Sequence, residues 1–186
     1  SGGDFLEGTI SRWLEEALAV FGTTRGEQVV IGSSMGGWLA LLLARALRQR
    51  GEGRIKALVL IAPAVDMTEE LMAAKFTAAE SEAMHRHGVV EQPSEYSDEP
   101  YPITYRLIAD GRQHLMLGAP IETGCPVTIL QGALDPDVPP EHARKLLSHI
   151  VLDPVTLTLV PDGDHRLSRE ADLRLLEEAI ARATEA

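Results

Sequence analysis

Short runs of β-branched and other apolar residues alternate along the chain with longer segments in which apolar residues recur every three or four positions. Runs of the first kind are typical of strands that are buried on both faces of a parallel sheet. Such runs lie at residues 28–32, 56–62, 126–131 and 155–160. Because helix-like segments separate them, the pattern predicts an α/β fold with a mostly parallel, doubly wound sheet.

The helix-like segments have recognisable ends. Ile10 begins a run of apolar residues at helical spacing, and Gly22 ends it, because glycine readily stops a helix. The pair Pro139-Pro140 is typical of the first turn of a helix, and Ser168 is a candidate N-cap for the last helix. The predicted helices cover residues 10–21, 36–50, 139 onward and 168–183.

One segment interrupts the alternation. Residues 63–120 lie between the second and third predicted strands and contain helix-like stretches near 67–75, 78–87 and 102–116. The polar stretch at 91–100 is typical of a solvated loop. An insertion after a strand of a parallel sheet lies where such sheets place their sites, so we expect a helical lid. Residues 1–62 and 121–186 would then form the core.

Residues 32–36 read Gly-Ser-Ser-Met-Gly, a G-x-S-x-G motif between a predicted strand and a predicted helix. In a sharp strand-to-helix turn of this kind the central serine is exposed, and small residues fit on either side of it. By itself the string is also compatible with an ordinary glycine-rich turn or a phosphate loop. Its context favours the catalytic interpretation, in which Ser34 is a nucleophile once a base accepts its proton.

A serine nucleophile needs a base and an acid that orients the base, and candidates follow the last two predicted strands. Asp135 comes after the third strand and a short turn, and His165 lies in a short loop after the fourth. The carboxyl ends of parallel strands meet at one edge of a sheet, so we expect Ser34, Asp135 and His165 to lie together. Asp137 is the alternative acid, but the prolines beside it favour a helix cap.

The other titratable residues have more ordinary explanations. Asp164 is expected to form hydrogen bonds within its own loop. The remaining histidines lie in helix-like patterns, where a solvated or packed imidazole is the usual case: His85, His87, His114, His142 and His149. The sequence has no cluster of histidines and cysteines at metal-ligand spacing, and the chemistry requires no metal and no cofactor.

The substrate would meet the backbone of the serine turn and the lid. The N–H of Met35 is the candidate oxyanion donor because it follows the serine at a helix N-terminus. The lid is rich in apolar side chains, most of which are expected to pack it onto the sheet while a few line an apolar pocket. The candidate pocket residues are Met67, Leu71, Tyr105 and Ile108.

Composition limits the classes of function. The 186 residues, 45% of them hydrophobic, are enough for one domain with its own core. A formal net charge of −11 disfavours nucleic acid and anionic membranes as partners. Cys125 is the single cysteine, so it excludes an intrachain disulfide, indicates a reducing compartment, and is expected to be a buried structural thiol. No apolar run has membrane-spanning length and no targeting segment is visible, so we expect a cytoplasmic location, or a mitochondrial one in a eukaryote.

Three strings together resemble one branch of a known superfamily. They are Gly32–Trp38, Pro93–Ser97, and Asp164–Arg166 followed by Glu170–Asp172. The chain resembles, over nearly its whole length, the α/β-hydrolase-fold proteins grouped with the mitochondrial palmitoyl-protein thioesterase that also cleaves acyl glucuronides. The resemblance implies a serine hydrolase that cleaves acyl thioesters or carboxylic esters through an acyl-enzyme. It also implies that Ser34 is the nucleophile, Asp135 the acid and His165 the base.

Two further expectations follow from the resemblance. A noncatalytic hydrolase-fold module that binds a ligand or partner is the alternative function, but three retained triad members favour the enzyme.

In this fold the serine follows the fifth strand, whereas here it follows the first predicted strand. The chain is thus expected to correspond to the last four strands, without the loop that supplies a second oxyanion donor. The strand at 28–32 would be a sheet edge, and residues 1–186 alone would be poorly soluble and nearly inactive.

Overall fold

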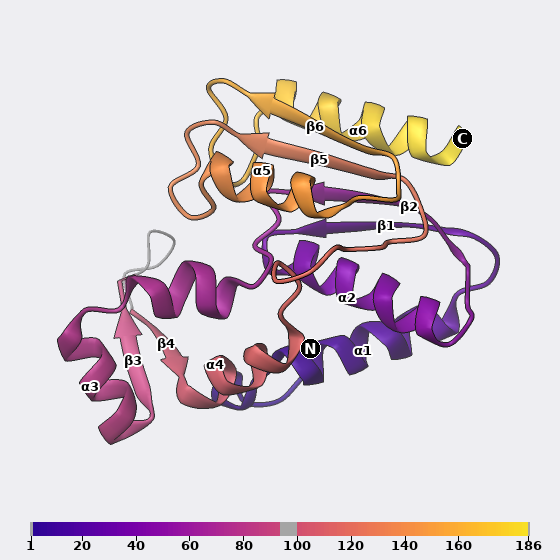
Figure 1. Ribbon diagram of the computed structural model, residues 1–186. Coiled ribbons are helices and arrows are strands. Elements are labelled where there is room, and N and C mark those ends of the chain that lie inside the picture. Colours follow the sequence, from indigo (N-terminus) through magenta and orange to yellow (C-terminus); the bar gives the residue numbers. More distant parts are fainter. Residues whose placement is uncertain (1, 94–99, 186) are drawn as a thin grey trace.

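The computed structural model describes residues 2–93 and 100–185. Its main sheet has four parallel strands in the order β1-β2-β5-β6. These strands are β1 (Gln28–Ser33), β2 (Ile55–Ile61), β5 (Val127–Gly132) and β6 (Val155–Val160). Each lies within one residue of the bounds that the apolar runs predicted. The four arrows point toward the side of the molecule where the segment between β2 and β5 lies (Figure 1).

Helices cover both faces of the sheet. One face carries α1 (Ile10–Thr23), α2 (Met35–Gln49) and α5 (Pro140–His149), and the other carries α6 (Glu170–Glu185) (Figure 1). Successive strand residues point to opposite faces, so Ile129 packs into the larger cluster under α1, α2 and α5, while Leu130 packs into the smaller cluster with α6. Cys125 is buried in the larger cluster, as expected. Among the described residues, no helix is both long and apolar enough to cross a membrane.

Side-chain caps determine where the first and last helices begin. Thr9 accepts a hydrogen bond from the N–H of Arg12 and so caps α1. The last helix, α6, begins at Glu170, two residues after the predicted cap Ser168. Asp172 in its first turn accepts the N–H of Arg169 at 3.2 Å and also binds the guanidinium of Arg169.

The segment between β2 and β5 forms a lobe beside the sheet, and we call its residues 63–120 the cap. It contains a π-helical turn η2 (Thr68–Met72), a 3-10 turn η3 (Ala73–Lys75), α3 (Ala78–His87), β3 (Val89–Gln92), β4 (Tyr101–Thr104), α4 (Tyr105–Gly111) and a 3-10 turn η4 (Arg112–His114). Most of the described elements of the cap are thus helices or helical turns.

A small antiparallel sheet in the cap differs from the prediction. β3 and β4 pair along their full lengths, from Val89 opposite Thr104 to Gln92 opposite Tyr101. The helix expected over 102–116 therefore begins only at residue 105, and the predicted loop at 91–100 starts within a strand; residues 94–99 lie outside the described residues. The chain turns from α3 into β3 at Gly88. The φ of this glycine is +73°, a left-handed conformation that ends the helix.

Hydrogen bonds join the two ends of the cap to each other and the cap to the core. Asp66, which follows β2, accepts the N–H groups of Met116 and Leu117 at 2.8 Å each, so the beginning and end of the cap are joined. Asp110 in α4 accepts the N–H of Ser11 in α1 at 2.8 Å. These contacts hold the cap beside the carboxyl ends of the strands.

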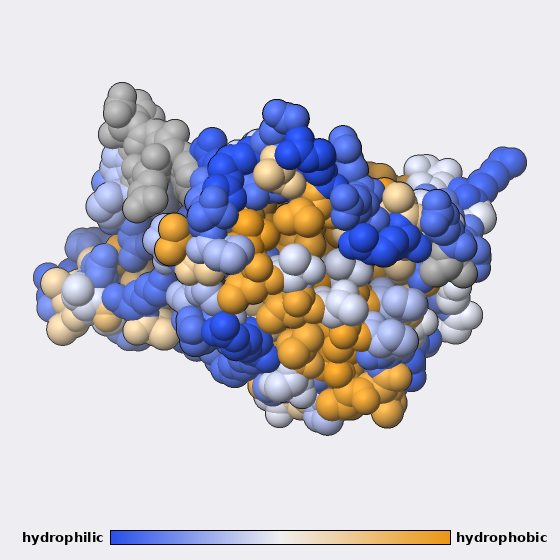
Figure 2. All heavy atoms as spheres, turned by 90° about the horizontal axis from the view of Figure 1, so that it is seen from above, coloured by the Kyte–Doolittle hydropathy of each residue, from blue (hydrophilic) through white to orange (hydrophobic). Residues whose placement is uncertain are grey.

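The edge of the sheet formed by β1 is unpaired among the described residues. Within the described residues, β1 pairs with β2 alone, and its Ile31 is 47% exposed. Apolar residues of α1, β1 and α2 line an open hollow of about 860 Å³ beside this strand. Figure 2 shows that hydrophobic residues also gather in a continuous area on the face seen from above. Unpaired strand edges and extended apolar surfaces favour association with other chains.

A polypeptide of residues 1–186 is therefore expected to self-associate, and Ile31→Lys is expected to reduce that association, because it places a charge on the unpaired edge. Sedimentation velocity over a range of concentrations measures the effect. Leu152→Lys is the matched control, since Leu152 is 69% exposed and does not line the hollow beside β1. A monomer at every concentration, or equal effects of the two substitutions, would contradict this prediction.

Candidate active site

Ser34 lies in the sharp turn between β1 and α2. Its φ of +52° is in the left-handed region, which a residue with a side chain adopts only under strain. The N–H of Ser34 donates to the carbonyl of Ile61 at 2.8 Å, and its carbonyl accepts from the N–H groups of Gly37 and Ala64. Bonds to β2 and to the residues after it thus hold the strained turn on both sides of the serine.

The glycines of the motif are not equivalent. A Cβ atom on Gly32 would lie 2.3 Å from the carbonyl oxygen of Gly36, and one on Gly37 would lie 2.8 Å from Pro63. A Cβ atom on Gly36 would meet nothing within 4 Å. Steric crowding therefore requires glycine at 32 and 37, whereas the second glycine of the motif has room for a side chain.

Hydrogen bonds join Ser34, His165 and Asp135 in one row. Nε2 of His165 lies 3.0 Å from Oγ of Ser34, and Nδ1 lies 2.8 Å from Oδ2 of Asp135. The three residues come from the carboxyl ends of β1, β6 and β5. A neutral imidazole that donates from Nδ1 to the carboxylate presents Nε2 as an acceptor for the serine proton.

The side chain of Asp135 is completely buried and accepts four hydrogen bonds. The N–H groups of Asp137 and Val138 donate to Oδ1, while Gln131 and His165 donate to Oδ2. Burial by itself would raise the pKa of Asp135, but the hydrogen bonds from His165 and Val138 outweigh burial and hold that pKa below its ordinary value. Asp135 is therefore ionised at neutral pH and can stabilise an imidazolium.

The pKa of His165 changes in the opposite direction. Its hydrogen bond with Asp135 raises the pKa, and partial burial of the ring opposes this effect. The nearby charges of Asp135, Asp137 and Asp164 raise the pKa further. Protonated His165 is thus more stable here than an ordinary histidine would be, which suits a group that carries a proton during a reaction.

Close packing positions the loop that carries His165. A Cβ atom on Gly132 at the end of β5 would lie 2.3 Å from the carbonyl oxygen of Asp164, so only glycine permits this approach. Oδ1 of Asp164 accepts the N–H of Leu167 at 2.9 Å, which confirms the predicted role of Asp164 as a hydrogen-bonding residue within its loop.

A hollow of about 510 Å³ opens in front of Ser34 and His165. Its walls come from the cap, from the loop after β5 and from an N-terminal 3-10 turn, η1 (Phe5–Glu7). The other lining residues are Phe5, Met67, Leu71, Met72, Lys75, Gln92, Pro93, Tyr101 and Asp137. Aromatic and aliphatic side chains thus combine with a few polar groups, as in sites that hold an apolar ligand in a fixed orientation.

The four candidate pocket residues divide into two pairs. Met67 and Leu71 line the hollow in front of Ser34. Ile108 is buried in a separate cluster inside the cap, and Tyr105 lines a different hollow between α1 and α4. Sequence reasoning missed Phe5, Lys75 and Gln92, because no local pattern indicates that these distant segments meet at the serine.

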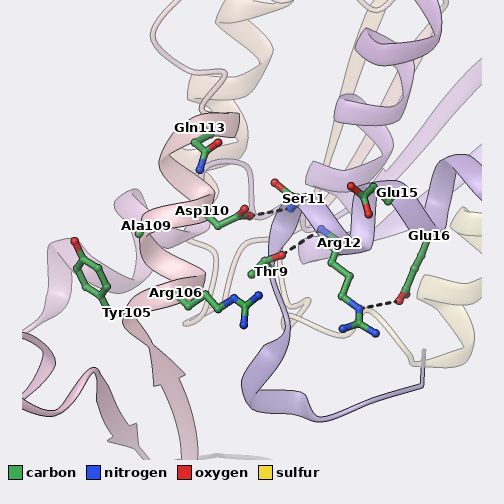
Figure 3. Close-up of a pocket in the computed structure, with 10 residues that line it drawn as sticks. All are labelled: Thr9, Ser11, Arg12, Glu15, Glu16, Tyr105, Arg106, Ala109, Asp110 and Gln113. Atoms are coloured by element: carbon green, nitrogen blue, oxygen red, sulfur yellow. Dashed lines mark hydrogen bonds and ion pairs between the residues drawn. The ribbon is translucent and has the colours of Figure 1, made fainter.

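The hollow between α1 and α4 is larger, about 920 Å³, but none of its lining residues belongs to the row of Ser34, His165 and Asp135. Figure 3 shows Tyr105 at one edge of this hollow and the side chains of α1 at the other. Its two arginines are already paired, Arg12 with Glu16 and Arg106 with a glutamate of η1. This hollow is therefore not the candidate active site.

A second serine and histidine meet near the hollow between α1 and α4. Oγ of Ser11 lies 2.7 Å from Nε2 of His114. Asp110 accepts the N–H of Ser11 and approaches the same histidine nitrogen, at 3.9 Å. The described residues thus offer no acid that orients the ring from its other nitrogen, so this group does not reproduce the catalytic arrangement.

The ligand atoms of Asp135, Asp137 and His165 lie within 4.8 Å of one another, which raises the question of a metal site. Nδ1 of His165 is hydrogen-bonded to Asp135, and Nε2 faces Ser34. Both ring nitrogens therefore already have partners that suit proton transfer, and the arrangement fits a catalytic base better than a metal ligand.

A family model described as "Alpha/beta hydrolase family" matches residues 3–178. The chain belongs to the alpha/beta hydrolase family. The fold class predicted from the sequence, an α/β-hydrolase fold with a mostly parallel sheet, is thereby confirmed. Two solved structures support this: a putative hydrolase from Agrobacterium vitis S4, 48% identical with a TM-score of 0.94, and mouse alpha/beta hydrolase domain-containing protein 10, 31% identical with a TM-score of 0.86. Each covers 98% of this chain, which covers 71% and 72% of theirs.

Comparison with curated proteins confirms the resemblance seen in the sequence of the chain. Bovine "Palmitoyl-protein thioesterase ABHD10, mitochondrial" is 34% identical over 180 residues, which cover 95% of this chain and 56% of the bovine protein. The human protein of the same name is 31% identical over 181 residues, with coverage of 95% and 56%. The chain thus spans little more than half the length of the curated relatives that it matches.

Proposed function

We propose that this chain carries the catalytic centre of a serine hydrolase that cleaves acyl thioesters or carboxylic esters. The observation that carries the proposal is the position of His165, whose two ring nitrogens lie 3.0 Å from Ser34 and 2.8 Å from Asp135. Those distances are in the range that a nucleophile, a base and an orienting acid require.

The proposed mechanism follows from this geometry. Nε2 of His165 accepts the proton as Oγ of Ser34 attacks the acyl carbonyl, and Asp135 stabilises the resulting imidazolium. The N–H of Met35, at the start of α2, lies where helices leave N–H groups without intrahelical partners and would bind the oxyanion. The imidazolium then gives its proton to the departing thiolate or alkoxide, and water repeats the sequence to release the acid.

The substrate class rests on two observations. The hollow at Ser34 joins apolar walls, including Met67, Leu71 and Phe5, to polar groups such as Gln92. The bovine and human relatives are named palmitoyl-protein thioesterases. We therefore propose an acyl chain that lies against the apolar walls, with the cap, residues 63–120, as the lid over the site. The alternative is a noncatalytic module that binds an acylated ligand in the same hollow.

The function is tested with a panel of matched acyl thioesters and oxygen esters. The assay uses a purified form of the protein that is as long as its curated relatives. Turnover of either class that a serine-directed fluorophosphonate abolishes would support the hydrolase. Saturable binding of the same compounds, without turnover and without covalent labelling, would support the binding module and overturn the proposal.

The pH dependence of kcat/KM is expected to show an acid limb above the ordinary histidine pKa of about 6.5. Only neutral His165 accepts the serine proton, and its pKa is raised by Asp135, by Asp137 and by Asp164. Activity is therefore lost as the pH falls through a pKa higher than usual. Asp137→Asn should move the limb to lower pH, because it removes one of these charges. A limb at or below 6.5, or a limb that moves upward in this variant, would contradict the assignment of His165 as the base.

A further inference from the structure

Gln131, near the end of β5, has a completely buried side chain that contacts the acid of the row. The two N–H groups on its Nε2 are shared among three acceptors: Oδ2 of Asp135 at 3.0 Å, the carbonyl of Val138 at 2.9 Å and that of Gly132 at 3.1 Å. All three partners are acceptors, so the amide has one chemically sensible orientation: turned over, its oxygen would face three other oxygens.

This amide is costly to bury. Oε1 of Gln131 has no hydrogen-bond partner among the described residues, although it is buried. A buried amide oxygen without a partner destabilises a fold, and the neighbouring Ile129 and Leu130 are apolar. Packing alone would favour another apolar residue at this position. The hydrogen bonds of the amide nitrogen therefore offset the free-energy cost of burying the oxygen.

The bonds to Asp135 show what the nitrogen contributes. The N–H groups of Asp137 and Val138 hold only Oδ1 of the carboxylate. Apart from His165 itself, Gln131 is the one described residue with a hydrogen bond to Oδ2. Without that bond His165 is the one described residue that holds Oδ2, so the carboxylate turns more easily about its Cβ–Cγ bond and Oδ2 shifts from its position opposite the imidazole.

We propose that Gln131 is a positioning residue for the reaction, which fixes the rotation of the Asp135 carboxylate so that Oδ2 faces Nδ1 of His165. The proposal rests on the proposed function, since it concerns the same row of residues. It assigns to Gln131 an effect on turnover through Asp135, with no contact to substrate.

The first test is Gln131→Met, which keeps the length of the side chain and removes the donor. We expect kcat to fall about tenfold to a hundredfold, the size of one hydrogen bond to a charged group, with KM unchanged. Ile129→Val is the matched control in the same strand: it removes a buried methylene and should lower the melting temperature without changing kcat. A Gln131→Met variant that loses stability but keeps its kcat would overturn the proposal.

The second test is Gln131→Glu, which restores a donor under one condition. Burial and the charge of Asp135 favour the protonated form of the introduced carboxyl group, which then donates to Oδ2. As the pH rises and this group ionises, it repels Asp135. We expect kcat near that of the wild type at the acidic end and an alkaline limb that the wild type lacks. A pH profile of the same shape as the wild type would count against the proposal.

A readout without substrate separates this proposal from the proposed function. NMR titration of the His165 ring, assigned by comparison with His165→Gln, reports its contact with Asp135 directly; Asp137 and Asp164 are the other charges that face it. In Gln131→Met the His165 pKa should fall toward the ordinary value, because the contact of the ring with Asp135 weakens. A fall in a protein without turnover would refute the hydrolase and support the positioning role. An unchanged titration in an active enzyme would support the hydrolase and overturn the positioning role of Gln131.

Discussion

Ser34→Ala is expected to lower the turnover of acyl thioesters and esters by at least about 10⁴-fold, because the acyl group then has no hydroxyl to bond to. KM is expected to change little, since the substitution removes only the hydroxyl oxygen of Ser34 from the wall of a hollow of about 510 Å³. A steady-state assay with a chromogenic thioester measures both quantities, and circular dichroism checks that the variant is folded.

The neighbouring serine supplies the control for this loss. Ser33 is the last residue of β1 and is exposed, and within the described part of the chain it forms no hydrogen bond with His165 or Asp135, so Ser33→Ala should keep most of the activity. Undiminished hydrolysis by Ser34→Ala, or a greater loss in Ser33→Ala, would show that another group attacks the acyl carbonyl.

Asp135→Asn is expected to lower kcat by about 10⁴-fold, the loss typical when an amide replaces the carboxylate and the imidazole takes the wrong tautomer. Two backbone N–H groups, a glutamine and His165 surround the carboxylate with donors, so an asparagine would also place its own NH₂ against a donor. The rate of the purified variant at the pH optimum of the wild type measures this effect.

Asp137→Asn should cost far less, at most about tenfold at the same pH. Asp137 gives its backbone N–H to Asp135, and the substitution keeps that bond. Its side chain lines the hollow, and its charge raises the pKa of His165, an effect smaller than that of the hydrogen bond with Asp135. The reverse ranking of the two variants would mean that Asp137 is the acid.

The parts of the fold that follow from local patterns could be predicted. A β-branched apolar run such as residues 126–131 is typical of a buried strand, and the glycines around Ser34 favour a tight turn, so the sheet and the positions of Ser34, Asp135 and His165 follow from the order of elements. The cap was harder, because Pro102 and Ile103 belong to a four-residue strand whose pairing with β3 is not encoded in any local period.

Other features depend on contacts between distant segments. Nothing in the sequence around Tyr105 shows that it faces α1 and not Ser34, since both surroundings accept a half-exposed aromatic residue. Gln131 ends an apolar strand, where a polar residue is usually the start of a loop, and its bond to Asp135 depends on how the loop at 132–138 folds back. The crowding at Gly37 likewise depends on Pro63, which follows the neighbouring strand.

The identity of the acylated residue tests the central claim most directly. The protein is mixed with a slowly hydrolysed acyl thioester, quenched in acid within one turnover, and analysed by intact mass and by peptide mapping. We predict one acyl group per chain, bonded to Ser34, and none in Ser34→Ala. An acyl group on Ser33 or Cys125, or turnover without any covalent intermediate, would contradict the account.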